Sequence, residues 1–145
     1  MVSHSSWTIA AAGVALLFGG CGEAPAPPEP AAPAPQVVAS SAGSWRVEYR
    51  ARPDPIPLNE PFGLTARIFS ADAPDVPRND VELAVDAAMP QHQHGMNRRA
   101  SVRRDGAGGF VASELLFHMP GEWRLYFDVT YGGLTERAEC VVRLD

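Results

Sequence analysis

The residues best suited to chemistry are six soft or borderline metal donors concentrated in two short segments. They comprise every histidine and methionine beyond the first twenty residues of this 145-residue chain: Met89, His92, His94 and Met96 in the first segment, and His118 and Met119 in the second. Thioether sulfur and imidazole nitrogen suit Cu(I), and imidazole also binds Cu(II) and zinc. No Asp or Glu falls between Asp86 and Asp105, which argues against calcium or magnesium. We therefore predict a copper site, with Cu(I) as the preferred ion and Cu(II) or zinc as alternatives.

The geometry of the first segment depends on its backbone. His92 and His94 are two residues apart, so an extended chain would place both imidazoles on one side. Gly95 would then let the chain turn and bring Met96 back toward them. The alternative is a passive loop with two solvated histidines, in which Met89 is simply the last core residue of a strand. A zinc or Cu(II) site made of the three histidines alone is a further alternative.

The second segment is expected to supply one donor, because adjacent residues of an extended chain point to opposite sides. The alternation before it predicts a set of core-facing residues, namely Val111, Ser113, Leu115 and Phe117. Met119 continues that set, so this register turns Met119 toward the core and His118 toward water. The sequence leaves open which of the two is the ligand.

Six segments with alternating hydrophobic residues and one polar segment, 98–104, separated by Pro, Gly and Asn, are typical of short β-strands. The expected strands are 45–49, 62–68, 81–87, 98–104, 110–117, 123–131 and 135–144, with a tight turn at Gly132-Gly133. We predict an all-β fold, an immunoglobulin-like β-sandwich of about seven antiparallel strands. Loops alternate between the two ends of such a sandwich. The third-to-fourth and fifth-to-sixth connections, which carry the six donors, should therefore lie at the same end.

The first 43 residues are expected to be a targeting signal followed by a membrane tether. Residues 8–18 form an apolar run about half as long as the roughly 20 residues of a membrane-spanning helix, which is typical of a secretory signal. The following Gly19-Gly20-Cys21 resembles a bacterial lipoprotein cleavage box, which implies a lipid on Cys21; an ordinary secretory signal is the alternative. The Pro/Ala-rich stretch 23–36 favours an extended linker. The expected parts are a signal peptide (1–20), a lipidated cysteine with a disordered tether (21–43) and a sandwich domain (44–145).

The two donor segments also carry a family resemblance. Residues 89–96 (MPQHQHGM) and 117–123 (FHMPGEW) resemble the YtkA-like domain, a small bacterial extracytoplasmic β-sandwich similar in architecture to periplasmic copper-resistance proteins. The resemblance covers about residues 45–144 and implies a role in copper handling. It matches Pro90, His92, His94, Gly95 and Met96 in the first motif, and Met119, Pro120, Gly121 and Trp123 in the second. His118 stands at a position that the family pattern does not fix.

Composition and charge reduce the number of function classes that the sequence supports. Seventeen acidic and twelve basic residues give a formal net charge of −5, which argues against a nucleic-acid partner. No Ser/His/Asp or Cys/His arrangement is present, so we do not expect an enzyme.

Cys140 is expected to be a small hydrophobe on the last strand, with a metal or redox thiol as the alternative. Four arginines near the first motif could dock an acidic partner or lipid headgroups, although a solvated edge strand is the preferred interpretation: Arg98, Arg99, Arg103 and Arg104.

Together these features predict a periplasmic or otherwise extracytoplasmic lipoprotein, attached to a membrane through Cys21. Its expected role is to bind Cu(I) for buffering or delivery, in exchange with an envelope protein partner. The alternative is a non-metal interaction module of an envelope complex, in which the MPxHxHGM and MPG segments are only structural turns, set by Pro90, Gly95, Pro120 and Gly121.

Overall fold

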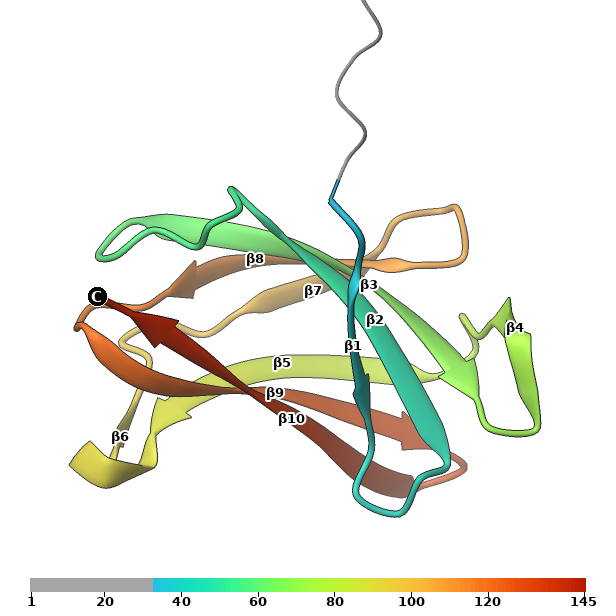
Figure 1. Cartoon of the computed structure of the whole chain (residues 1–145). Helices are drawn as coiled ribbons and strands as arrows, with labels where there is room; N and C mark the ends of the chain where they lie inside the picture. The colour runs from blue at the N-terminus through green and yellow to red at the C-terminus, as the bar shows by residue number, and fades with distance from the viewer. Residues whose placement is uncertain (1–32) are drawn as a thin grey trace, which may run out of the picture. The chain divides into compact units, whose positions relative to one another are not determined.

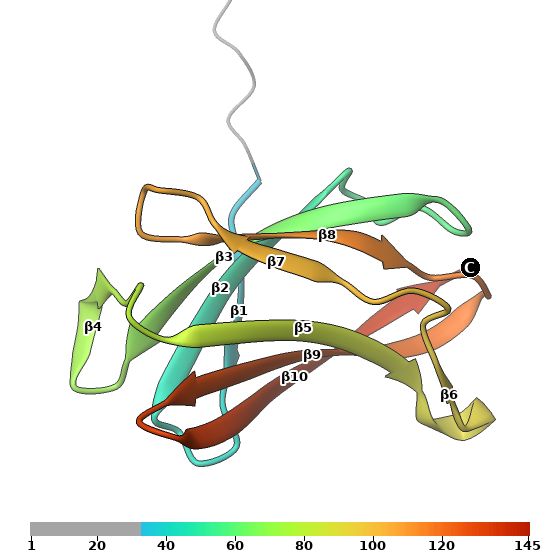
Figure 2. The same cartoon turned by 180° about the vertical axis from the view of Figure 1, so that it is seen from behind.

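The computed structural model describes residues 33–145. The expected signal peptide, Cys21 and the first part of the tether lie outside the described residues. From Pro33 onward the chain forms two antiparallel β-sheets packed face to face (Figures 1 and 2), which confirms the predicted all-β sandwich. Among these residues there is no helix with the length and apolarity needed to span a membrane.

The larger sheet has six strands in the order β1-β2-β3-β8-β7, with β4 paired to β3. Its strands are β1 (Gln36–Ala39), β2 (Trp45–Arg52), β3 (Pro61–Ser70), β4 (Ala73–Pro77), β7 (Ser101–Arg104) and β8 (Phe110–Leu116). The four-stranded sheet has the order β10-β9-β5-β6 and consists of β5 (Glu82–Met89), β6 (His94–Gly95), β9 (Gly121–Tyr131) and β10 (Leu134–Leu144). Without the short strands β1, β4 and β6, this is the strand order of a constant-type immunoglobulin domain.

Alternate residues of both sheets fill the space between them, as the hydrophobic pattern predicted. The largest fully buried side chains include Trp123, Phe117, Phe127, Leu64, Ile68 and Met89. The predicted inward sets of β2, β3, β5 and β9 are all buried, except that Tyr131 at the end of β9 is 48% exposed. Burial of these apolar surfaces is the main force that holds the two sheets together.

The predicted register of β8 is wrong in its first half. Phe110 and Ala112 are buried, whereas Ser113 is exposed. The cause is a β-bulge, in which Ser113 and Glu114 together lie opposite Gly63, and Glu114 adopts a positive φ of 66°. The extra residue resets the alternation, so Leu115 and Phe117 face the core as expected.

The folded domain begins earlier than the expected boundary at residue 44. Strand β1 lies within the stretch assigned to the tether and pairs with β2. Ser40 then joins the domain firmly, because its Oγ accepts the N–H of Trp45 (3.0 Å) and donates to Glu136 (2.7 Å). Four mostly exposed residues that follow a Pro-rich stretch give little hydrophobic signal, which explains why β1 was not predicted.

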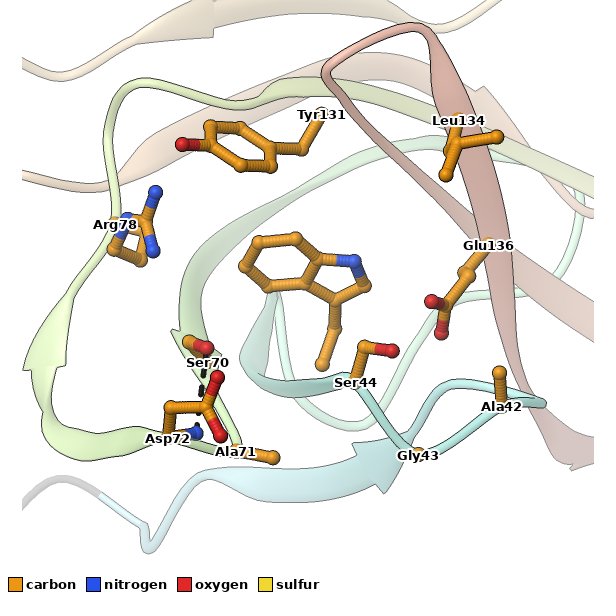
Figure 3. Close-up of a pocket in the computed structure, with 11 residues that line it drawn as sticks. Ala42, Gly43, Ser44, Ser70, Ala71, Asp72, Arg78, Tyr131, Leu134 and Glu136 are labelled. Carbon is orange, nitrogen blue, oxygen red and sulfur yellow. Dashed lines mark hydrogen bonds between the residues drawn. The ribbon is translucent and has the colours of Figure 1, made fainter.

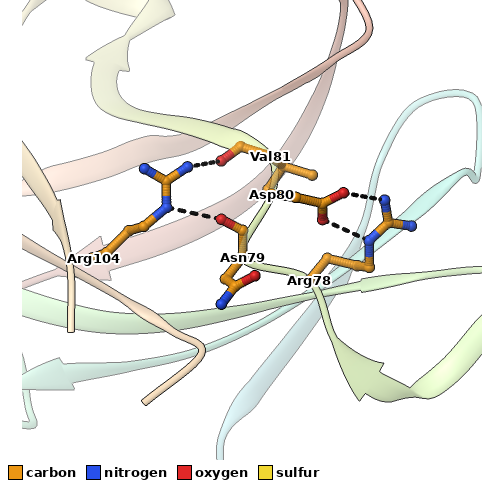
Figure 4. Close-up of polar contacts among 5 residues, drawn as sticks. All are labelled: Arg78, Asn79, Asp80, Val81 and Arg104. Carbon is orange, nitrogen blue, oxygen red and sulfur yellow. Dashed lines mark hydrogen bonds and ion pairs between the residues drawn. The ribbon is translucent and has the colours of Figure 1, made fainter. Parts of the chain in front are cut away.

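A side chain at the end of β7 links the two sheets (Figure 4). Arg104 donates to the backbone carbonyls of Asn79 (2.8 Å) and Val81 (2.9 Å), which lead into β5 of the other sheet. In the same connection Arg78 and Asp80 form an ion pair with two hydrogen bonds of 2.7 Å. These contacts hold the β4–β5 connection against the edge of the larger sheet.

Candidate metal centre

The two donor segments meet at one end of the sandwich, as the strand order predicted. The ring centroids of His94, in β6, and His118, after β8, are 5.3 Å apart. The His92 ring lies 5.9 Å from the His94 ring. The three imidazoles therefore form a row with His94 in the middle, which we call the histidine row.

The backbone of the first segment is a tight turn and is not extended as expected. Residues Pro90–His92 form a single 3₁₀ turn, and Gln93 follows with a left-handed φ of 56° and donates its N–H to the Pro90 carbonyl (3.1 Å). Gln91 fastens this turn to β9 by donating to the backbone carbonyl of Glu122 (2.6 Å). The turn still brings the rings of His92 and His94 side by side, but by a route that the two-residue spacing did not predict.

His94 is placed by its pairing with β5. It lies directly opposite Met89 in the β5–β6 ladder, so the two side chains stand on the same face of the sheet. Its Nδ1 is 3.3 Å from the carbonyl oxygen of Gly95. In the tautomer in which Nδ1 donates this proton, Nε2 keeps a lone pair, an arrangement common among metal-binding histidines.

His118 is half-buried, so the expectation that it faces water is wrong. Its ring meets Trp123 edge-on, with centroids 5.3 Å apart. Its Nδ1 is buried and has no hydrogen-bond partner among the described residues. Leaving such a nitrogen unpaired costs about 1–3 kcal/mol. His118 is thus the donor of the second segment that reaches the first, although the motif did not single it out.

Two aromatic side chains form a wall behind the histidine row. Trp123 lies 6.2 Å from the His94 ring, and Phe117 stacks on the other side of the indole at 4.6 Å. The Trp123 Nε1 donates to the carbonyl oxygen of Met119 (2.9 Å), which fixes the turn before β9. From the sequence, Trp123 was expected only to be a core residue. Its place in the second motif was the one indication that it lies beside the histidine row.

The methionines have three different environments. Met89 is fully buried at the end of β5, as the core interpretation predicted, but it also neighbours His94. Its methyl group lies close to Gly121, where an added Cβ would be 3.0 Å from Met89 Cε. Met96 and Met119 are partly buried and pack against the edge of the core. All three belong to the same end of the sandwich as the histidine row.

The distances between the imidazole rings fit coordination of one shared metal ion. The ring nitrogens, however, do not point to one common position. Two imidazoles bound to one ion at about 2.0–2.1 Å have centroids roughly 5–6.5 Å apart. The observed 5.9 and 5.3 Å fall in this range, but the rings are tilted by 32° and 35°. Among residues 33–145, no three His, Cys, Asp or Glu side chains converge on a common point. Rotation of the imidazoles would be needed to aim their nitrogens at one ion.

Two further candidate sites, at Cys140 and at the far end of β9, do not involve the six donors. Cys140 is half-buried with its Sγ 3.1 Å from the Tyr49 hydroxyl, and burial raises the pKa of this thiol, which makes it a poor nucleophile. A hollow of about 490 Å³ opens at the other end of β9, beside Tyr131, Arg78 and Glu136 (Figure 3). None of the six donors lines it.

No known protein family, curated protein or solved structure matches the chain. The resemblance to the YtkA-like domain therefore stays a prediction from the two motifs. What the structure defines is an immunoglobulin-like sandwich with three imidazoles and three thioethers at one end.

Proposed function

We propose that this protein is a cell-envelope lipoprotein that binds Cu(I) at the histidine row, for copper buffering or delivery. The observation that carries the proposal is the approach of His94 and His118, 5.3 Å apart between ring centroids although they come from separate loops. The buried, unpartnered Nδ1 of His118 adds to it, because a ligand at that nitrogen would remove the cost of burial.

The proposed ligands are the imidazoles of His92, His94 and His118 with one thioether. Met89 is the first choice for the sulfur, because it faces the same side as His94 from the neighbouring strand. Met96 and Met119, which are both partly buried against the core, are the other candidates. A thioether in the set favours Cu(I), whereas zinc or Cu(II) would be held by the imidazoles without sulfur.

The location in the envelope is part of the proposal and rests on Cys21, which lies outside the described residues, and on the Pro/Ala-rich stretch 23–36, of which only residues 33–36 are described. An oxidising compartment supports the choice of donors, because free thiolates oxidise there while Met and His remain usable ligands. A site at an exposed end of the sandwich would allow a partner protein to approach and exchange the ion.

A second candidate is a non-metal interaction module of an envelope complex. It is favoured by the structural roles of the motif residues: Pro90 begins a 3₁₀ turn, and Gly121 has a φ of +120° and lies against Met89. The hydrogen bond from His94 to the Gly95 carbonyl fits this candidate as well. These roles explain the Pro and Gly residues of the motifs but not the gathering of three histidines.

Titration of residues 33–145 with Cu(I) against a competing chelator separates the candidates. We expect one Cu(I) per chain, and a loss of affinity of about tenfold or more in His94→Ala and in His118→Ala. Asn97→Ala, at an exposed position of the same segment, is the matched control and should stay within about twofold. Tryptophan emission, which Trp123 reports from beside the row, provides a second readout.

Unchanged Cu(I) binding in the His94→Ala/His118→Ala double variant would contradict the proposal. Met89→Leu and Met96→Leu, which keep the side-chain volume, then identify the sulfur ligand. Tighter binding of zinc or Cu(II) than of Cu(I), with no effect of either methionine variant, would reassign the ion.

A further inference from the structure

The arginines of the domain are divided between paired and unpaired groups. Six of them form ion pairs with carboxylates: Arg46, Arg78, Arg98, Arg124, Arg137 and Arg143. Among the residues that the structure describes, the others have no carboxylate within ion-pair distance. Four of these lie on the outer surface of the six-stranded sheet, and we call them the basic face: Arg50, Arg52, Arg67 and Arg103.

Strand register places two members of the basic face in one row. Arg50 lies opposite Thr65, Thr65 opposite Val111, and Val111 opposite Arg103. At a strand spacing of about 4.8 Å, the row spans roughly 14 Å from β2 to β7. The two residues between the arginines are uncharged and half-buried, so no acidic group interrupts the row.

The other two members share the same side of the sheet. Arg52 follows Arg50 by two residues in β2, and Arg67 follows Thr65 by two residues in β3. The intervening inward positions confirm this orientation, because Ala66 is buried and Ala51 is half-buried. The basic face therefore presents four guanidinium groups on one side of the larger sheet.

Three acidic residues border the basic face. Glu48 lies directly opposite Arg67 in the β2–β3 ladder and pairs with Arg46 (3.2 Å), and Asp54 lines a hollow with Arg50. Asp105 accepts the backbone N–H groups of Ala107 (2.7 Å) and Gly109 (2.9 Å) in the β7–β8 turn. The outer surface of the four-stranded sheet differs, because its arginines are ion-paired to acidic neighbours on β9 and β10. Among the described residues, arginines without an ion-pair partner thus gather on the outer surface of the larger sheet, with these three carboxylates at its border.

We propose that the basic face docks on the anionic phospholipid headgroups of the membrane to which the chain is tethered. Guanidinium groups bind phosphate oxygens through two parallel hydrogen bonds, and cations near an anionic leaflet are attracted to it. The chain enters the domain on this same side: the Pro33 carbonyl accepts a hydrogen bond from Arg50 (2.9 Å), and Pro35 borders a hollow with Arg50 and Arg67.

The tether has a length that permits such contact. The residues between Cys21 and Pro33 span at most about 3.1 Å each if extended, so a lipid on Cys21 would keep the domain within a few tens of Å of the surface. Weak attraction by the basic face is then sufficient to orient the domain. Docking by this face leaves the end of the sandwich with the histidine row in water. The inference rests on the proposed lipid anchor.

Vesicle sedimentation with residues 33–145, which contain the whole hydrophobic core, tests the surface without lipid anchor or metal. We expect binding to phosphatidylglycerol vesicles at low salt, little binding to phosphatidylcholine, and release at about 500 mM NaCl. The triple variant Arg50→Gln/Arg67→Gln/Arg103→Gln should lose about tenfold in partitioning. The control Arg124→Gln/Arg137→Gln/Arg143→Gln removes the same charge from the other sheet and should stay within about twofold.

Equal losses in the two triple variants, or equal binding to both lipids, would overturn the proposal. Stronger retention on immobilised polyglutamate than on the anionic vesicles would assign the face to an acidic protein and would also overturn it. Cu(I) binding plays no part in these measurements, so failure here is distinguishable from failure of the proposed function.

Discussion

His118 and Met119 show how one residue of register decides which side chain joins a site. The candidate ligands could be identified from the sequence, because all His and Met residues beyond the first twenty positions cluster in two segments. Which of the two would reach the first segment was not predictable. Strand β8 ends at Leu116, so the alternation on which that expectation depended does not continue to His118 and Met119. Local backbone irregularities of this kind leave no hydrophobic signal.

The missing side chain of Gly121 leaves room for Met89 beside the candidate metal site. Its φ of +120° is unfavourable for any side chain, and a Cβ there would lie 3.0 Å from the Met89 methyl group. We predict that Gly121→Ala lowers the free energy of unfolding by about 2–3 kcal/mol, from backbone strain together with displacement of Met89. Urea denaturation of residues 33–145 measures this change.

Gly106→Ala separates the two causes. Gly106 also has a positive φ (+81°), but no atom lies within 4 Å of an added Cβ. This variant should cost only the strain, about 1 kcal/mol. If both variants lower the free energy of unfolding by the same amount, the contact between Gly121 and Met89 does not contribute to stability.

At the scale of elements, all seven predicted strands are present, and β1, β4 and β6 were not predicted from the sequence. Strand β4 (APDVP) contains two prolines and pairs with β3 through an irregular register, and β6 has only two residues. Such strands form because neighbouring backbone groups are already in place, and they bury little of their own surface. The histidine row depends on β6, so its exact position could not be read from the sequence.

The two adjacent arginines at the end of β7 give an element-scale prediction. Arg104 joins the sheets through the carbonyls of Asn79 and Val81, whereas Arg103 stands on the outer surface. We expect Arg104→Met to lower the free energy of unfolding by about 1–2 kcal/mol, and Arg103→Met to change it by less than about 0.5 kcal/mol. Thermal or urea unfolding of the two variants, compared directly, checks this. A larger loss in Arg103→Met would contradict the assigned contacts.

At the scale of the whole domain, strand order accounts for the separation of the two proposed sites. The immunoglobulin-like topology brings the two donor loops to one end, while the basic face lies on the outer surface of the larger sheet. The topological argument for a common end succeeded because it needed only the number and order of the strands. The detailed geometry of the site depends on the left-handed turn at Gln93 and on the end of β8 at Leu116, which the sequence did not reveal.

The most direct test of the account is a side-chain ¹H–¹⁵N spectrum of residues 33–145, whose histidines are His92, His94 and His118. Addition of Cu(I) under anaerobic conditions should shift the ring nitrogens of His94 and His118 together, and the change should be complete at one equivalent. Ring signals of His94 and His118 that stay unchanged, or that shift without saturating, would contradict a shared copper site.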